Sequence, residues 1–338
     1  MSLVNTQWRL AARPVGLPKA TDWEYVEEPA AEPEDGEFRV SVEYLSLDPA
    51  MRGWMNEGRS YVPPVGIGEV MRAGGIGRVV DSRNPEFDTG VQVSGQFGVQ
   101  RYAVSDGRGV MRIDTSLAPA PVHLGVLGMT GLTAYFGLLE VGRPEPGQTV
   151  VVSGAAGAVG SVAGQIARIK GCRVVGIAGG PVKCAWLVEE LGFDAAIDYK
   201  RGDLRADLRR HAPDGVDVYF DNVGGETLDE VLRRLARGAR VVICGAISQY
   251  NAREAPRGPA NYMQLLVERA SMTGFLVFDY AARYSEAIAE LAGWLRAGEL
   301  SSREDIVSGA LEDFPEVFLR LFRGENTGKL ILQLEEAR

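Results

Sequence analysis

The fold is decided by residues 150–180, which read VVVSGAAGAVGSVAGQIARIKGCRVVGIAGG. An apolar run, Val150–Val152, leads into a loop with glycines at positions 154, 157 and 160. A segment with helical spacing follows, and a second apolar run, Arg173–Ala178, comes after it. Strand, glycine turn, helix and strand in this order form the context in which a glycine motif predicts dinucleotide binding.

The glycine loop is suited to a phosphate group. Glycines let the backbone approach a ligand closely, because they carry no Cβ. The predicted helix, Ala158–Lys170, follows directly, and Gly171 comes next as a normal stop signal. The first N–H groups of the helix have no partner inside it, so they and the helix dipole together favour a pyrophosphate at this end.

The second predicted strand ends without a carboxylate. NAD-binding proteins place Asp or Glu there, about 20 residues after the glycines, to bind the ribose 2′-OH. This chain reads Ala178-Gly179-Gly180 instead, and Lys183 follows in the first turn of a helix opened by Pro181. A cation at a helix start opposes the helix dipole, and an anionic ligand would remove that conflict. A 2′-phosphate is such an anion, so the pattern favours NADP(H) over NAD(H), with an ordinary solvated lysine as the alternative.

Composition restricts the class of protein. The 338 residues are 46% hydrophobic and 24% charged, which is typical of a soluble globular protein of two domains. The net charge of −9 argues against a nucleic-acid partner, and no apolar stretch reaches the ~18 residues that span a membrane. The N-terminal sequence, MSLVNTQWRLAARP, has no signal-peptide core, and the three cysteines form no close-spaced pair. We therefore expect a cytoplasmic protein.

Residue counts also disfavour metal and hydrolase chemistry. The only histidines are His123 and His211, and the cysteines are too scattered to complete a standard zinc pattern. No G-x-S-x-G nucleophile elbow occurs. We therefore expect no metal site and no Ser-His-Asp hydrolase.

The first and middle parts of the chain carry different patterns. Up to about residue 120, short alternating runs separated by turn residues predict a barrel-like all-β unit. From Val150 onward, apolar runs alternate with helical segments, which predicts a parallel sheet covered on both faces. The last part, Ile306–Leu334, returns to short strands, and we expect it to fold back onto the first domain. Further predicted strands are Phe38–Leu47, Gly75–Asp81, Val91–Gly98, Ala195–Tyr199, Val216–Asp221 and Arg240–Gly245, and further predicted helices are Leu124–Leu139, Glu226–Ala236, Tyr262–Glu268, Ala281–Ala297 and Phe314–Arg323.

Six ordered motifs resemble one enzyme family across nearly the whole chain. The resemblance is to the zinc-independent branch of the medium-chain dehydrogenase/reductases. Within that branch it is to the NADPH-dependent alkenal/one oxidoreductases, which include prostaglandin reductases and curcumin-reductase-like enzymes. The motifs are YLSLDPAMRGWM (Tyr44–Met55), GMTGLTAYFGL (Gly128–Leu138), SGAAGAVGS (Ser153–Ser161), FDNVGG (Phe220–Gly225), CGAISQYN (Cys244–Asn251) and GENTGKLIL (Gly324–Leu332).

This resemblance implies an α/β fold with two domains. Residues 1–125 and 300–338 would form a GroES-like β-barrel catalytic domain, and residues 126–299 a doubly wound Rossmann domain that binds NADP(H). It also implies a homodimer. Zinc-bearing relatives have a cysteine ligand early in the catalytic domain, whereas residues 45–49 here read LSLDP and no cysteine precedes Cys172.

Matching motifs imply the cofactor contacts. The glycine loop would line the pyrophosphate, two residues would hold the 2′-phosphate, and the others would border the ribose and nicotinamide. From the residues alone, Asn326 could equally be a turn residue and Tyr199 a half-buried strand aromatic. The implied contacts are Ala156, Gly157, Ala158, Val159 and Gly160 at the pyrophosphate, Lys183 and Tyr199 at the 2′-phosphate, and Asn222, Cys244, Gly245, Ala246, Ile247, Phe275, Leu276, Val277 and Asn326 beyond.

The implied reaction reduces the C=C bond of an α,β-unsaturated aldehyde or ketone by hydride transfer to its β-carbon. Tyr262 matches a tyrosine that the family places near the substrate carbonyl. A phenol with a reference pKa of about 10 is a protonated donor at neutral pH, although a packed aromatic is the alternative. Tyr44, Met129, Tyr250 and Phe275 are candidates for the substrate wall, each equally plausible as core, and we expect Tyr61 in a loop that borders the substrate pocket. A quinone reductase and a non-catalytic NADPH-binding protein are the rival functions.

Overall fold

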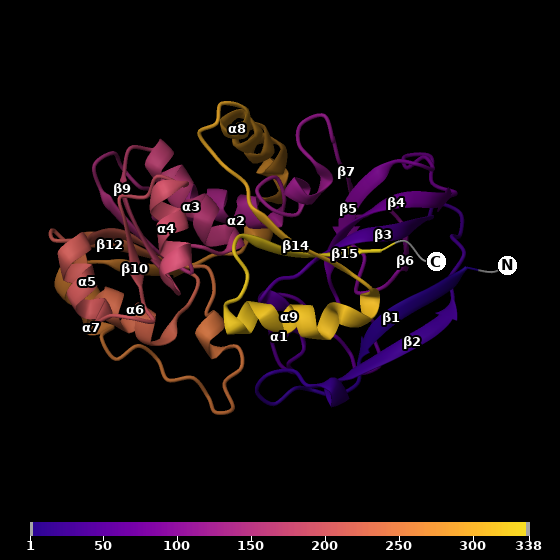
Figure 1. Cartoon of the computed structure of the whole chain (residues 1–338), viewed down its shortest axis with the longest axis horizontal. Coiled ribbons are helices and arrows are strands. Elements are labelled where there is room, and N and C mark those ends of the chain that lie inside the picture. Colours follow the sequence, from indigo (N-terminus) through magenta and orange to yellow (C-terminus); the bar gives the residue numbers. More distant parts are fainter. Residues whose placement is uncertain (1–2, 336–338) are drawn as a thin grey trace. The chain divides into compact units, whose positions relative to one another are not determined.

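The computed structural model describes residues 3–335, which form two compact units (Figure 1). One comprises the chain up to Leu124 together with the chain from Glu304 onward, and the other comprises Gly125–Arg303. Among residues 3–335, no helix is both long and apolar enough to cross a membrane.

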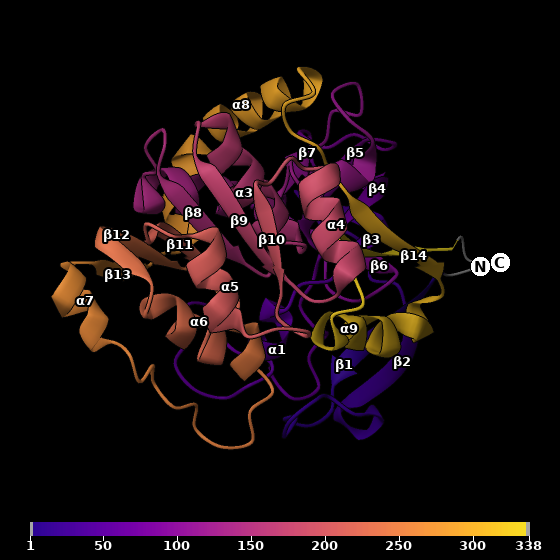
Figure 2. The same cartoon turned by 60° about the vertical axis from the view of Figure 1, so that its left-hand side comes forward.

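The Gly125–Arg303 unit is built on a six-stranded parallel sheet with the order β10-β9-β8-β11-β12-β13. The chain begins in the middle with β8, moves outward to β10, and then returns to form β11 on the other side of β8. The direction of strand addition therefore reverses between β8 and β11, as Figure 2 shows. The strands are β8 (Thr149–Ser153), β9 (Arg173–Ala178), β10 (Ala195–Asp198), β11 (Val216–Asp221), β12 (Leu235–Ile243) and β13 (Ser271–Gly274).

Helices cover both faces of this sheet. Successive strand residues point to opposite sides, and apolar side chains on both sides must be shielded from solvent. Helices α5, α6 and α7 share an apolar cluster with Val151, Tyr219 and Val241. On the other face, a side chain at Gly176 would meet Leu187 of α4. Because helices shield both faces of the sheet from solvent, a central strand such as β8 is buried along its whole length. The helices of the unit are α2 (Met129–Phe136), α3 (Ala158–Ile169), α4 (Pro181–Glu189), α5 (Leu204–His211), α6 (Gly225–Leu232), α7 (Met263–Glu268) and α8 (Tyr284–Arg296), with shorter helical turns at η3 (Gly137–Gly142), η4 (Ile247–Gln249) and η5 (Val277–Arg283).

The other unit is a mixed sheet with the order β14-β15-β3-β4-β5-β7, in which β6 pairs with β3. Strands β14 and β15 come from the end of the chain, and β15 pairs antiparallel with β3, so the C-terminal segment completes this unit. Helix α9 packs Phe314 and Phe318 against Trp23 in its core. The elements are β1 (Val4–Leu10), β2 (Trp23–Pro29), β3 (Phe38–Ser46), α1 (Ala50–Trp54), β4 (Gly74–Ser82), β5 (Gln92–Gln96), β6 (Tyr102–Ser105), β7 (Met111–Arg112), β14 (Glu304–Gly309), α9 (Phe314–Arg323) and β15 (Lys329–Leu334), with short turns η1 (Ala20–Asp22), η2 (Ala120–His123) and η6 (Leu311–Asp313).

The predicted fold class is confirmed, and two predicted helices need correction. The helix predicted over Glu226–Ala236 ends at Leu232, because Leu235 already begins β12. The helix predicted over Leu124–Leu139 begins only at Met129, where Gly128 is extended, and it continues as a wider turn over Gly137–Gly142.

Candidate functional site

The glycine loop and Asn222 lie at the carboxyl ends of β8 and β11, the two strands between which the strand order reverses. Open α/β sheets bind their ligands at this position. The Asn222 side-chain amide donates to the Ser153 carbonyl over 2.7 Å, which ties the two strand ends together.

Glycine lets α3 pack closely against the loop that precedes it. A Cβ at Gly160 would lie 2.3 Å from the Gly154 carbonyl oxygen, so no side chain fits where α3 passes the loop. Ala156 is buried in the loop, and Ala158, Val159 and Gly160 form the first turn of α3. The N–H groups of Ala158, Val159 and Gly160 have no acceptor within the helix and are donors that suit a pyrophosphate, whereas the N–H of Gly157 donates to the Gly154 carbonyl over 2.9 Å.

Asp221 organises this end of the sheet, and sequence reasoning missed it. Its side chain is 1% exposed. Oδ1 accepts from the Ser153 hydroxyl and the Tyr219 phenol, both over 2.8 Å, and from the N–H groups of Val223 and Gly224. Burial, with the charge of Asp221 beside it, holds the pKa of Tyr219 well above its usual range, so that phenol stays a donor. The one sequence feature that could have pointed to Asp221 is its place in the FDNVGG motif.

The turn after β12 lies on the same edge. The N–H groups of Cys244 and Gly245 donate to the Asp221 carbonyl over 2.9 and 3.0 Å. The N–H of Ala246 donates to the Tyr250 hydroxyl over 3.2 Å, so Tyr250 folds back onto this turn. Burial, followed by the charge of Asp221, raises the pKa of Cys244 to about 12, so its thiol is protonated and is no nucleophile.

The two predicted 2′-phosphate residues follow neighbouring strands, Lys183 after β9 and Tyr199 directly after β10. Lys183 lies in the first turn of α4. A Cβ at Gly179 would lie 3.0 Å from the Tyr199 hydroxyl and 2.9 Å from Cε of Lys200, so both side chains pack against this glycine. Lys200 directly follows Tyr199 and brings a further positive charge to this glycine, which was not among the predicted site residues.

The remaining candidates of this unit lie in different settings. The ring of Phe275 packs on Gly137 of η3, and the Val277 carbonyl accepts from the Tyr284 hydroxyl over 3.0 Å. Met129 begins α2. Tyr262 precedes α7 with its side chain 57% exposed, and its neighbour Asn261 is bound to Asp229 of α6. Tyr250 thus contacts the turn after β12, whereas Tyr262 is more than half exposed.

Three candidates belong to the mixed-sheet unit. The Asn326 amide donates to the Gly328 carbonyl over 3.0 Å, within the turn that leads into β15. The Tyr44 hydroxyl accepts from Gln333 over 3.4 Å, and the Tyr61 hydroxyl accepts from the Trp54 indole over 3.2 Å.

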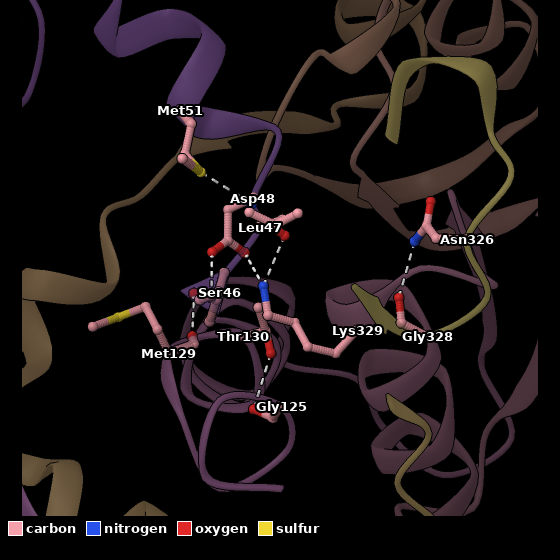
Figure 3. Close-up of polar contacts among 11 residues, drawn as sticks. Ser46, Leu47, Asp48, Met51, Gly125, Met129, Thr130, Asn326, Gly328 and Lys329 are labelled. Carbon is pink, nitrogen blue, oxygen red and sulfur yellow. Dashed lines mark hydrogen bonds and ion pairs between the residues drawn. The ribbon is translucent and has the colours of Figure 1, made fainter. Parts of the chain in front are cut away.

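A buried lysine, paired with a partly exposed aspartate, lies directly after the Asn326 turn (Figure 3). The Lys329 side chain is 2% exposed, and its ammonium donates to the Leu47 carbonyl over 2.9 Å and to Asp48 Oδ1 over 2.6 Å. The Ser46 hydroxyl donates to the other Asp48 oxygen over 2.5 Å. Burial lowers the pKa of Lys329, and the charge of Asp48 opposes that shift. The pair anchors β15 to the LSLDP segment.

Comparison with known proteins identifies the family. Residues 6–113 match a family described as the N-terminal domain of oxidoreductase, and residues 158–293 match one described as zinc-binding dehydrogenase. The chain is 41% identical to the NADPH-dependent curcumin reductase of Escherichia coli, over 98% of this chain and 97% of that protein. It is 41% identical to the NADP(+)-dependent 2-alkenal reductase of Nicotiana tabacum, over 86% of this chain and 85% of that protein. The chain belongs to the NADPH-dependent alkenal/one oxidoreductase family.

A solved structure agrees with this assignment. The crystal structure of CurA from Vibrio vulnificus in complex with NADPH matches with a TM-score of 0.92 and 44% identity, over 98% of this chain and all of that one. The chain is therefore an NADP-dependent oxidoreductase, which confirms the predicted cofactor and enzyme class.

Although one matched family is described as zinc-binding, this chain has no cysteine before Cys172. Within residues 3–335, no group of three or more His, Cys, Asp or Glu side chains could hold a metal. The individual site residues stay predictions.

Proposed function

We propose that this protein uses NADPH to reduce the C=C bond of α,β-unsaturated aldehydes and ketones. The observation that carries the proposal is the identity of 41% with both the curcumin reductase and the 2-alkenal reductase, over nearly all of the first protein and most of the second. The carboxylate-free turn after β9, with Lys183 beyond it, supports NADPH over NADH.

NADPH, when bound, supplies the hydride. The protein must hold the alkene and stabilise the negative charge that develops on the carbonyl oxygen. The glycine loop and Asn222 would hold the cofactor at the carboxyl ends of β8 and β11. The turn after β12 and the Phe275–Val277 segment would border the nicotinamide.

Two tyrosines are candidates for the group that donates a hydrogen bond to the carbonyl oxygen. Tyr262 is the candidate from the family motif. The contacts support Tyr250 instead, because its hydroxyl lies on the turn after β12, whereas Tyr262 is largely exposed beside α6. We therefore take Tyr250 as the first candidate and Tyr262 as the second.

The test is NADPH oxidation by the purified enzyme with a panel of 2-alkenals, enones and quinones, and with NADH as the control cofactor. We expect turnover with alkenals and enones, and the loss of the substrate C=C bond by mass spectrometry. Preference for quinones would indicate a quinone reductase. Tight NADPH binding without turnover on any substrate would indicate a non-catalytic binding protein.

We also propose that the protein is a homodimer. Strand β13 is the exposed edge of the parallel sheet, and an unpaired edge is a template for another strand. Helix α7 beside it has no buried residue and exposes Met263, Leu266 and Val267. A second copy would cover this apolar edge.

The cytoplasmic location stays a prediction, supported by three cysteines that form no disulfide.

A further inference from the structure

Asp198, at the end of β10, joins two turns that carry predicted cofactor contacts. Its Oδ1 accepts from the N–H of Gly180 over 2.8 Å and from the N–H of Lys200 over 3.0 Å. Gly180 lies between β9 and α4, and Lys200 follows β10. Because β9 and β10 are paired, with Ala178 opposite Asp198, one carboxylate oxygen fixes the spacing of both turns.

Both turns lead to the same glycine. The Tyr199 ring and the Lys200 side chain pack against Gly179, whose absent Cβ would lie 2.9 Å from each. Gly180 has a φ of +98°, a backbone conformation that leads directly into α4 and Lys183. The two turns that Asp198 joins therefore lead to two cations, Lys183 and Lys200, and to the phenol of Tyr199.

The negative charge of Asp198 would repel the 2′-phosphate of NADPH, since both groups are anionic. We therefore look for the role of Asp198 in the backbone geometry that it fixes, and not in a direct contact with the phosphate. In NAD-binding proteins a carboxylate at the end of the second strand bonds the ribose 2′-OH. Here the carboxylate ends the next strand, and Oδ1 is occupied by two backbone N–H groups. Arg201 lies 4.0 Å from Oδ2 and offsets part of the charge.

We propose that Asp198 is a positioning residue for the 2′-phosphate of NADPH and that Lys200 is a second cation that contacts it. The proposal rests on the proposed assignment of Lys183 and Tyr199 to the same phosphate. Asp198 acts through the backbone of Gly180 and Lys200 and does not touch the ligand.

The test measures binding without catalysis. Isothermal titration calorimetry of the full-length protein with 2′,5′-ADP and with 5′-AMP separates the contribution of the 2′-phosphate to binding from that of the rest of the adenosine half. We expect Asp198→Ala to weaken 2′,5′-ADP binding by about tenfold, the size of one lost charge-assisted contact, and to leave 5′-AMP binding unchanged. Asp198→Asn keeps an oxygen acceptor and should bind 2′,5′-ADP at least as tightly as the natural protein.

Asp194→Ala is the matched control. Asp194 also accepts one backbone N–H, from Val174 over 2.7 Å, but it lies at the opposite end of β10. This variant should leave the binding of both ligands unchanged. Lys200→Met tests the second cation without removing Asp198, and it should weaken 2′,5′-ADP binding alone.

Three results would overturn the proposal. In Asp198→Ala, equal weakening of both ligands would indicate general damage to the fold, and unchanged 2′,5′-ADP binding would remove the positioning role. Tighter 2′,5′-ADP binding in both Asp198 variants would show that repulsion is its main effect. Failure of the proposed reaction is distinguishable, because it would leave these affinities as expected while no enone is reduced.

Discussion

At the residue scale, Tyr250 and Tyr262 decide how the substrate carbonyl is polarised. We expect Tyr250→Phe to lower kcat at least several-fold and to leave NADPH affinity near normal, because only the developing oxyanion loses a donor. Tyr262→Phe is the matched variant. Steady-state rates with one enone and NADPH titration of each variant check this. A several-fold loss in Tyr262→Phe alone would return the role to the residue predicted from the motif.

The Lys329–Asp48 pair permits a second prediction for single side chains. Asp48→Asn leaves a buried ammonium without its carboxylate, which we expect to lower the free energy of unfolding by about 3 kcal/mol or more. The pKa of Lys329 in the folded protein, already lowered by burial, would fall further. The unfolded chain then holds this proton more tightly, so the stability of the variant rises with pH between the two pKa values.

Urea unfolding of Asp48→Asn at neutral and at alkaline pH measures this effect. The deficit relative to the natural protein should shrink at alkaline pH. Asp106→Asn is the control, because that aspartate lies on the surface beside Arg108, and it should leave stability unchanged. A deficit of equal size at both pH values would mean that the buried ammonium is not its cause.

Residues of this kind were the part of the site that the sequence could not predict. Lys183 stands in a local pattern, a turn and a helix start, that can be read along the chain, whereas Tyr199 was implied only by the family resemblance. Lys329 meets Asp48 across 281 positions, and Asp221 meets Ser153 across 68. No local pattern encodes such a pairing, because it depends on which strands become neighbours.

At the scale of elements, predictability followed burial. Strands β9 and β11 have the predicted bounds, because a strand buried on both faces is one apolar run. Strand β13 was not predicted, since Ser271–Gly274 is short and exposed. The start of β12 was assigned to the preceding helix, because its first residues, Leu235-Ala236-Arg237, suit a helix as well.

The packing of α3 on the glycine loop gives a prediction for an element. In Gly160→Ala the new Cβ would meet the Gly154 carbonyl at 2.3 Å, which pushes the start of α3 from the loop. We expect NADPH binding to weaken by about tenfold or more, since 1.4 kcal/mol suffices. Gly293→Ala in α8 is the control: its Cβ meets nothing within 4 Å, and it should raise stability by about 0.5–1 kcal/mol. Equal NADPH affinity in both variants would contradict the tight approach of α3.

At the scale of the whole molecule, the proposed homodimer explains an exposed apolar edge that a monomer would leave to water. Leu266 on α7 is 70% exposed beside the open edge strand β13. Leu266→Asp should cost a monomer little, because the side chain makes few contacts there, but it should weaken a dimer that buries it. Val15→Asp is the matched control, since Val15 is 69% exposed in the other unit. Light scattering coupled to size-exclusion chromatography should give a dimer for the natural protein and Val15→Asp, and a shift toward monomer for Leu266→Asp. A monomeric natural protein would refute the homodimer, and an unshifted Leu266→Asp dimer would move its interface away from α7.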